Sequence, residues 1–462
     1  MSDDFTTLLE QFGVHIENFA FDKAKEAVEE FRATKTASSP TAGGNGTHAS
    51  INSSSQEAFA WTSLIQCLPY LAVAEKNYMS LSFLLPKGFL RKESPLRSNY
   101  GSIRSELVKI SENLSCDVTD IAPPRQTVVG HLASQLKRFI DARIDLITLY
   151  ERLSALGACA GGSKAAAFDD SYVSCIDDIN QRYSGAFTHP LISGIVGNLI
   201  SECETLASLL KCQAKLALLM FMDSLLALKN AQSGLKVLSR SSSSADLESS
   251  HSSGWFGFAS SIKSPVLPPL FSWHKRYYDT LLSKFSLYFH DLLIKQTTPQ
   301  DMRTQLSKVP DSYLQRIAAF HRKQDAAFVC LILNAEGTGH YQWQGYHHPD
   351  HKVEPLKGLE NYPVILSYPI GQERPPHLLP STVMIMNEQS MKLASLDGTA
   401  SVYDDSKDVS YFLCRIEALL YLLVMFKGRK SERDSHVATF VHDLCADLRC
   451  MKVFASLKAA AK

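Results

Sequence analysis

The apolar residues of this chain change their spacing once, near Gln324, and that change constrains the fold more than any other feature. Before it, apolar side chains recur every three or four residues, which is typical of amphipathic helices. After it, short apolar runs alternate with turn-forming clusters, which is typical of strands. The sequence therefore predicts an α+β chain, with a large helical bundle domain over residues 1–324 and a smaller α/β domain with an antiparallel sheet over residues 325–462.

Two helical segments of the first part carry the clearest apolar stripes. Between Val128 and Leu156 the spacing places seven side chains on one face, and from Leu270 to Lys295 a largely aromatic stripe must bury against neighbouring helices. The two stripes comprise Leu132, Leu136, Ile140, Ile144, Ile147, Tyr150 and Leu153, and then Trp273, Tyr277, Leu281, Phe285, Phe289 and Leu293. Further helices are expected over residues 5–34, 56–84, 98–114, 169–183, 194–230, 300–308 and 311–323.

Two stretches of the first part have few apolar residues and are predicted to be disordered loops, over residues 36–55 and 239–269. The run from Arg240 to Ser244 in the second loop is a candidate for phosphorylation, which would add charge and order the segment. The composition favours a flexible linker, since Ser-rich tracts are disordered without any modification.

Seven short strand candidates and a closing helix are expected in the second part. The strand candidates span residues 326–333, 341–346, 364–368, 382–386, 400–403, 409–415 and 419–426. The closing helix is predicted over residues 431–449, with Ser431 as its N-cap and Asp434 three residues later. Its buried face is expected to comprise Val437, Phe440, Val441, Leu444 and Leu448.

The overall composition indicates a globular chain and argues against nucleic-acid binding. Hydrophobic residues make up 45% of it, and 47 basic residues balance 47 acidic ones, so a basic excess is lacking. The ten cysteines form no C-x-x-C pair, which favours reduced thiols in an intracellular protein. We expect no signal peptide, and the apolar runs at 216–228 and 418–426 are too short or interrupted to span a membrane.

One cluster of residues suggests chemistry. His340, His347, His348 and His351, with Asp350 among them, contain residue types that ligate zinc. Adjacent histidines on a strand point to opposite faces, and the sequence has no second half-site, so a structural or surface loop is favoured over a metal-dependent enzyme. The sequence also lacks a G-x-S-x-G elbow, a phosphate-binding P-loop and a G-x-G-x-x-G fingerprint. We therefore predict no catalytic, cofactor-binding or metal-binding residue.

Several short blocks, taken together, resemble one family. They include A-E-K-N-Y at 74–78, K-F-S-L-Y-F-H at 284–290, G-Y-H-H-P at 345–349 and K-S-E-R-D-S-H at 430–436, along with F-D-K-A-K-E at 21–26 and K-V-F-A-S-L-K at 452–458. The blocks are collinear and span nearly the whole chain, and they resemble those of the KICSTOR complex subunit 2 family.

This resemblance implies a non-enzymatic scaffold subunit of the KICSTOR complex, beside kaptin, an FG-GAP-repeat subunit and a large scaffold subunit. It implies that the complex recruits GATOR complex 1 to the cytosolic face of the lysosome, where it restrains mTOR complex 1 during amino-acid or glucose starvation. The chain would then be peripheral to the membrane through its partners. The resemblance also implies a C-terminal domain like roadblock, longin or profilin modules, so a small-GTPase regulator is an alternative by fold analogy.

Overall fold

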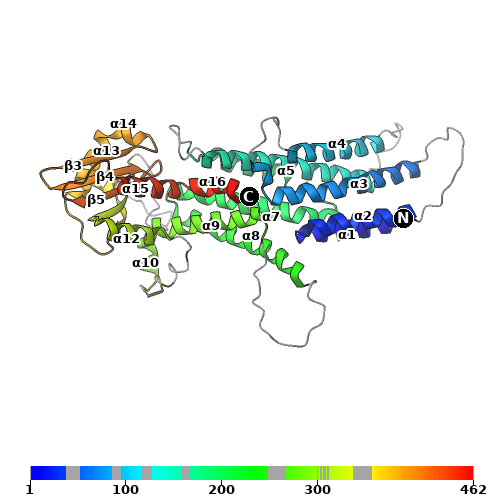
Figure 1. Ribbon diagram of the computed structural model, residues 1–462, viewed down its shortest axis with the longest axis horizontal. Helices are drawn as coiled ribbons and strands as arrows, with labels where there is room; N and C mark the ends of the chain where they lie inside the picture. Colours follow the sequence, from blue (N-terminus) through cyan, green and yellow to red (C-terminus); the bar gives the residue numbers. More distant parts are fainter. Residues whose placement is uncertain are drawn as a thin grey trace, which may run out of the picture.

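The computed structural model describes residues 2–37, 53–85, 95–115, 127–158, 167–247, 267–298, 300–301, 304, 309, 312–336 and 356–460 of the chain. Within these residues the molecule is elongated, with a helical part at one end and a sheet covered by helices at the other (Figure 1). The fold class is therefore α+β, as predicted. No described helix combines the length and the apolarity that crossing a membrane requires.

The helical part is built from long helices packed side by side. They are α1 (Ser2–Glu17), α2 (Phe21–Ala37), α3 (Ser53–Met79), α4 (Pro95–Ser115), α5 (Val128–Ala158), α6 (Asp170–Tyr183), α7 (Ser193–Ala217), α8 (Phe221–Leu247) and α9 (Pro269–Tyr288). Helix α5 contacts α3, α4 and α6, and six of its seven predicted stripe residues are buried while Ile144 is half-buried. The predicted face of α5 is therefore confirmed.

Three predicted helices are each interrupted where an apolar residue adopts a left-handed backbone conformation. Phe19 (φ 59°) separates α1 from α2, and Leu219 (φ 54°) separates α7 from α8. Leu81 (φ 59°) follows α3 and precedes the short helix η1 (Ser82–Leu84). Such conformations are unusual for these residue types, so periodicity alone did not reveal the breaks.

The described residues bear on part of each predicted loop. Helix α2 continues to Ala37 and α3 begins at Ser53, while α8 continues to Leu247, into the segment predicted as a loop over 239–269. Residues 38–52 and 248–266 lie outside the described residues, so the prediction of disorder there stays a prediction.

The second part contains a five-stranded antiparallel sheet in the order β2-β1-β5-β4-β3. Its strands are β1 (Phe328–Leu333), β2 (Val364–Tyr368), β3 (Thr399–Asp404), β4 (Val409–Arg415) and β5 (Leu420–Lys427). The other elements are η3 (Pro190–Ile192), η5 (Gly358–Asn361), α10 (His290–Gln296), α12 (Tyr313–Gln324), α13 (Leu378–Glu388), α14 (Ser390–Ala394), α15 (Ser435–Leu448) and α16 (Met451–Ala460).

Both faces of the sheet are covered by helices. Val329 and Leu331 of β1 belong to the core that includes α15, whereas Cys330 and Ile332 pack in a second core with α13. Alternate residues of β1 thus point to opposite faces, as the pleat requires. This explains why the strand is apolar along its whole length.

Two sequence predictions for this part are wrong. Residues 382–386 form helix rather than strand, because the buried residues Leu378, Thr382 and Ile385 of α13 recur at helical spacing. The N-cap of α15 is Asp434 rather than Ser431, since the Asp434 carboxylate accepts the backbone N–H groups of His436 and Val437. The strand predicted at 341–346 lies outside the described residues.

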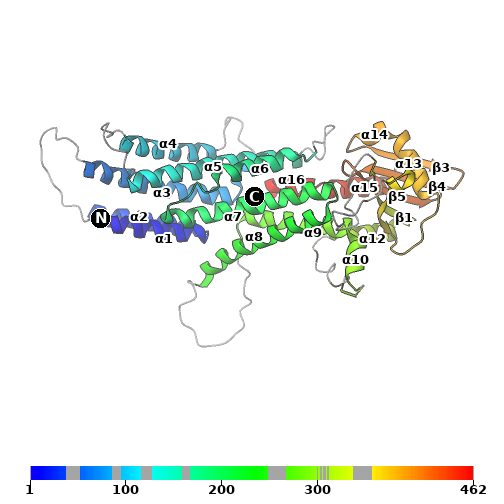
Figure 2. The same ribbon diagram turned by 180° about the vertical axis from the view of Figure 1, so that it is seen from behind.

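The last helix returns from the sheet to the helical part. Helix α16 packs on α5 and α9, and the end of α16 lies midway along the molecule (Figures 1 and 2). The division into domains at residue 324 stays a prediction, and the chain after that residue contributes both to the sheet and, through α16, to the packing of the helical part.

Candidate functional site

A junction forms where α9 packs on the start of α16, just after the helix α15 that covers the sheet, and it uses the aromatic stripe of α9. Trp273 Nε1 donates a hydrogen bond of 2.8 Å to the carbonyl of Val453. Tyr277 packs edge-on against Phe454, with ring centroids 5.3 Å apart, and donates its hydroxyl proton to Gln213 of α7. Three helices therefore meet in one buried contact.

A glycine allows α5 to approach this junction closely. A Cβ atom placed on Gly157 would lie 2.1 Å from the backbone nitrogen of Ala455, a separation that no side chain can occupy. The backbones of α5 and α16 therefore touch at this point, which fixes the position of the last helix.

A buried lysine links α9 to the hairpin between β4 and β5. Lys284 is fully buried, and its ammonium forms an ion pair with Glu417. From the end of α15, Arg449 Nε also donates a hydrogen bond to the carbonyl of Ile416 in this hairpin, at 2.8 Å. Removing one member of such a buried pair leaves an uncompensated charge, so these contacts hold the sheet in place against the helical part.

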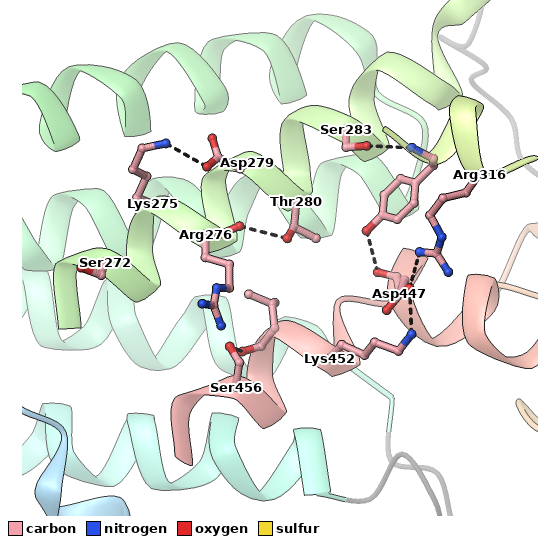
Figure 3. A pocket seen from close by; sticks show the side chains of 12 residues that line it. Ser272, Lys275, Arg276, Asp279, Thr280, Ser283, Arg316, Asp447, Lys452 and Ser456 are labelled. Atoms are coloured by element: carbon pink, nitrogen blue, oxygen red, sulfur yellow. Dashed lines mark hydrogen bonds and ion pairs between the residues drawn. The ribbon is translucent and has the colours of Figure 1, made fainter. Parts of the chain in front are cut away.

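A polar cavity of about 640 Å³ opens beside the same junction (Figure 3). At one side, Asp447 pairs with both Arg316 and Lys452, and the Lys452 contact is 3.0 Å long. At the other, Lys275 pairs with Asp279 at 2.9 Å. The lining comprises Ser272, Lys275, Arg276, Asp279, Thr280, Ser283, Tyr313, Arg316, Asp447, Lys452, Val453 and Ser456.

A second group of polar residues lies in the interior of the helical part. The Arg143 guanidinium of α5 contacts Glu75 of α3 at 2.7 Å and Glu202 of α7 at 2.5 Å, and all three side chains are at most 1% exposed. Three tyrosine hydroxyls complete the shell, because Tyr100 donates to Glu75 at 2.6 Å, and Tyr78 and Tyr150 donate to Glu202 at 2.6 and 2.9 Å.

Burial determines the protonation of this network. Desolvation raises the pKa of Glu202, an effect that the Arg143 guanidinium opposes. For Arg143 desolvation acts to lower the pKa, but Glu75 and Glu202 hold it well above its ordinary value. Desolvation also lowers the pKa of His274 to about 3, so this imidazole is neutral where its Nε2 lies 2.8 Å from the Tyr150 hydroxyl. With its charges paired and shielded from solvent, the network serves to align α3, α5 and α7.

The described residues do not include the histidine cluster that was singled out from the sequence. His340, His347, His348 and His351 lie outside the described residues, and so does Asp350. Elsewhere, the described part of the chain contains no group of three or more His, Cys, Asp or Glu side chains able to hold a metal ion.

Sequence reasoning missed the buried network, although a signal for it was present. Arg143 lies between Ile140 and Ile147, on the apolar stripe of α5, and Glu202 lies between Leu199 and Leu206 on α7. A charged residue within an apolar stripe indicates a buried, paired charge. Glu75 likewise belongs to the A-E-K-N-Y block that carried the family resemblance.

Comparison with known proteins agrees with this resemblance. The family model described as "KICSTOR complex C12orf66 like" matches residues 3–462. The chain belongs to this family. The protein named KICSTOR subunit 2 from Danio rerio is 34% identical to it over 461 residues, covering 98% of this chain and 96% of the relative. KICSTOR subunit 2 from Xenopus laevis is 33% identical, with 98% and 97% covered. The match to this family thus extends over both the helical part and the sheet.

Proposed function

We propose that the chain is a non-catalytic scaffold subunit of the KICSTOR complex. The main support is that relatives named KICSTOR subunit 2 match it over nearly their whole length, so both the helical part and the sheet have counterparts in them. The buried arrangement of Arg143, Glu75 and Glu202 is consistent with a structural role, because a substrate would have no access to these groups.

Within that complex, the chain would act beside kaptin, an FG-GAP-repeat subunit and a large scaffold subunit. Its role would be to help recruit GATOR complex 1 to the lysosomal surface, and so to restrain mTOR complex 1 during amino-acid or glucose starvation. The support for these partners and this location is the family resemblance of the sequence. The lysosomal membrane would be reached through the partners.

The edge strand β3 is our candidate for docking. It pairs only with β4 among the described strands and is contacted by α14, just as β2 at the opposite edge pairs with β1 and is contacted by α9 and α10. An edge strand can accept a strand from a partner through backbone hydrogen bonds. Beside it, Met384 of α13 is 61% exposed and Met391 of α14 is 89% exposed, so apolar side chains are also available near this edge.

The order of elements supports our proposal that the second part is a roadblock- or longin-like module. A helix (α12) precedes β1 and β2, α13 separates these from β3, β4 and β5, and α15 follows. The strand order β2-β1-β5-β4-β3 places the first and last strands side by side at the centre.

Paired substitutions of exposed apolar residues test the scaffold proposal. Met384→Glu with Met391→Glu addresses the sheet end, and Leu225→Glu with Leu226→Glu addresses α8. These side chains are exposed, so the variants should fold, which circular dichroism would verify. We expect at least one pair to abolish co-purification of the large scaffold subunit from cells, while the conservative change Gln389→Glu between the two methionines leaves it intact.

The cellular role is tested in cells lacking the chain. During starvation, GATOR complex 1 should fail to reach lysosomes and mTOR complex 1 should stay active, and only variants that bind the scaffold subunit should restore both. Normal assembly of every folded variant across both parts, or normal starvation responses without the chain, would contradict the proposed function.

A further inference from the structure

The polar cavity beside the junction carries an excess of positive charge. Four of its lining side chains are cationic, namely Lys275 and Arg276 of α9, Arg316 of α12 and Lys452 of α16, whereas Asp279 and Asp447 are its two carboxylates. The described residues provide no ion-pair or hydrogen-bond partner for the Arg276 guanidinium. Figure 3 shows this side chain extending from α9 toward Ser456 of α16.

The cations are also more exposed than the carboxylates that they contact. Lys275 is 59% exposed and Asp279 21%, while Lys452 is 54% exposed and Asp447 only 10%. Each carboxylate is thus largely covered by its own partners, and the groups that remain open to an incoming molecule are ammonium and guanidinium groups. The cavity therefore presents a positive surface.

The lining hydroxyls do not change this conclusion. Ser456 donates to the carbonyl of Val453 at 2.7 Å, Thr280 to that of Arg276 at 2.9 Å, and Ser272 to that of Leu267 at 3.2 Å. Because these protons are already engaged, the free hydrogen-bond donors of the cavity belong to the cationic side chains. A ligand rich in acceptors fits such a site better than a neutral sugar or an amide, which also needs acceptors.

We propose that this cavity binds a phosphate-bearing anion. A phosphate monoester carries a charge of about −1.5 to −2 at neutral pH and has three acceptor oxygens, which matches the excess of two positive charges. Arginine recognises phosphate through two parallel N–H groups, and Arg276 has both available. The volume of about 640 Å³ lies in the range of small-molecule sites, so the phosphate would belong to a molecule the size of a sugar phosphate or a nucleotide.

Such a ligand would contact helices that precede and follow the sheet in the sequence. Arg276 lies on α9, before the sheet, while Lys452 lies on α16, after the last helix that covers the sheet. The bound anion would add contacts between α9, α12 and α16, and would thus stabilise the junction against opening. The anion has two possible sources, a free metabolite or the headgroup of a phosphorylated lipid.

Calorimetric titration of the full-length chain with inorganic pyrophosphate and with inositol hexakisphosphate tests the proposal. A second arm measures co-sedimentation with phosphatidylcholine vesicles that contain or lack a phosphoinositide. We expect saturable binding with one site per chain, weakened about tenfold or more in Arg276→Gln, because a charge-assisted bidentate contact is lost. Lys275→Gln should weaken binding in the same direction.

Arg322→Gln provides the matched control, since Arg322 is an exposed arginine of α12 that is not part of the cavity lining. Binding of the soluble probes would support a free anion, and binding to phosphoinositide vesicles alone would support a lipid headgroup. The proposal is overturned if no phosphate probe binds saturably, if Arg276→Gln binds as tightly as the unmodified chain, if Arg322→Gln is weakened equally, or if a poly-glutamate peptide binds more tightly than the phosphate probes.

Discussion

Replacing Arg143 with methionine should destabilise the helical part far more than replacing an exposed arginine. Methionine retains an unbranched stem of similar length but removes the guanidinium, so Glu75 and Glu202 lose the cation that contacts them at 2.7 and 2.5 Å. Both carboxylates are at most 1% exposed, and water cannot replace the lost partner. The tyrosine hydroxyls alone would then solvate two buried negative charges.

The expected cost follows from that burial. Removing one partner of a buried ion pair costs about 3–5 kcal/mol, since the remaining charge is left uncompensated. For a structural unit of this size such a loss lowers the midpoint of thermal unfolding by about 5–10 °C. The control is Arg104→Met on α4, where the pair with Asp141 is 45% exposed on the arginine side. Surface pairs contribute about 0–1 kcal/mol, so the control should shift the midpoint by at most about 3 °C.

Differential scanning fluorimetry and urea titration of the two variants would measure these shifts. Acidification provides a second readout, because burial already raises the pKa of Glu202 in the folded chain. Because the folded-state pKa of Glu202 is raised, protonating this carboxyl stabilises the fold. This stabilisation is fully present below the unfolded-state pKa of about 4.3 and is lost as the pH rises through the folded-state pKa. The deficit of Arg143→Met relative to the unmodified chain should therefore shrink toward acidic pH. Equal midpoints for Arg143→Met and Arg104→Met would refute the reasoning.

Two further predictions concern the backbone. Gly157→Ala should displace α16, because the new Cβ would lie 2.1 Å from the backbone nitrogen of Ala455, and hydrogen exchange of the α16 amides should accelerate. Gly101→Ala is the control: its Cβ would meet open space, so it should stabilise α4 by about 0.5–1 kcal/mol. Asp434→Ala should cost about 1 kcal/mol of unfolding free energy at pH 7, measured by urea titration. Although desolvation acts to raise the pKa of Asp434, its hydrogen bonds to Val437 and Lys430 lower it below the usual 3.8. The contribution of this cap is thus present above pH 4 and should disappear as pH falls further. Unchanged exchange in α16, or a cost for Asp434→Ala that persists at pH 2, would contradict these predictions.

The spacing of apolar residues predicted the positions of most helices and strands, and it was wrong where a short apolar run is compatible with either a helix or a strand. The strands β4 and β5 lie where apolar runs with aromatic and branched residues predicted them. The run at 382–386 is also apolar and rich in branched residues, but it continues the helical spacing that begins at Leu378, outside the run itself. A short apolar run by itself cannot distinguish a strand from a buried helix segment, and the length over which the helical spacing continues is what separates the two.

The candidate site was less accessible to sequence reasoning than the fold. The junction depends on pairs far apart in sequence, such as Trp273 with Val453 and Lys284 with Glu417, and spacing along the chain holds no information on such contacts. The cationic cavity likewise combines residues from α9, α12 and α16, none of which is a basic run by itself. Only the buried charges at Arg143 and Glu202 had a local signature, as ions on otherwise apolar helix faces.

The return of α16 onto α5 and α9 has a mechanical consequence. The chain passes between the helical part and the sheet twice, entering the sheet through α12 and leaving it through α15. The sheet therefore cannot rotate freely, as a unit attached by a single linker could. Under the proposed scaffold role, proteins bound at opposite ends of the molecule would be kept at a set spacing and angle. In that role, the length of the helical part would set the distance between such proteins.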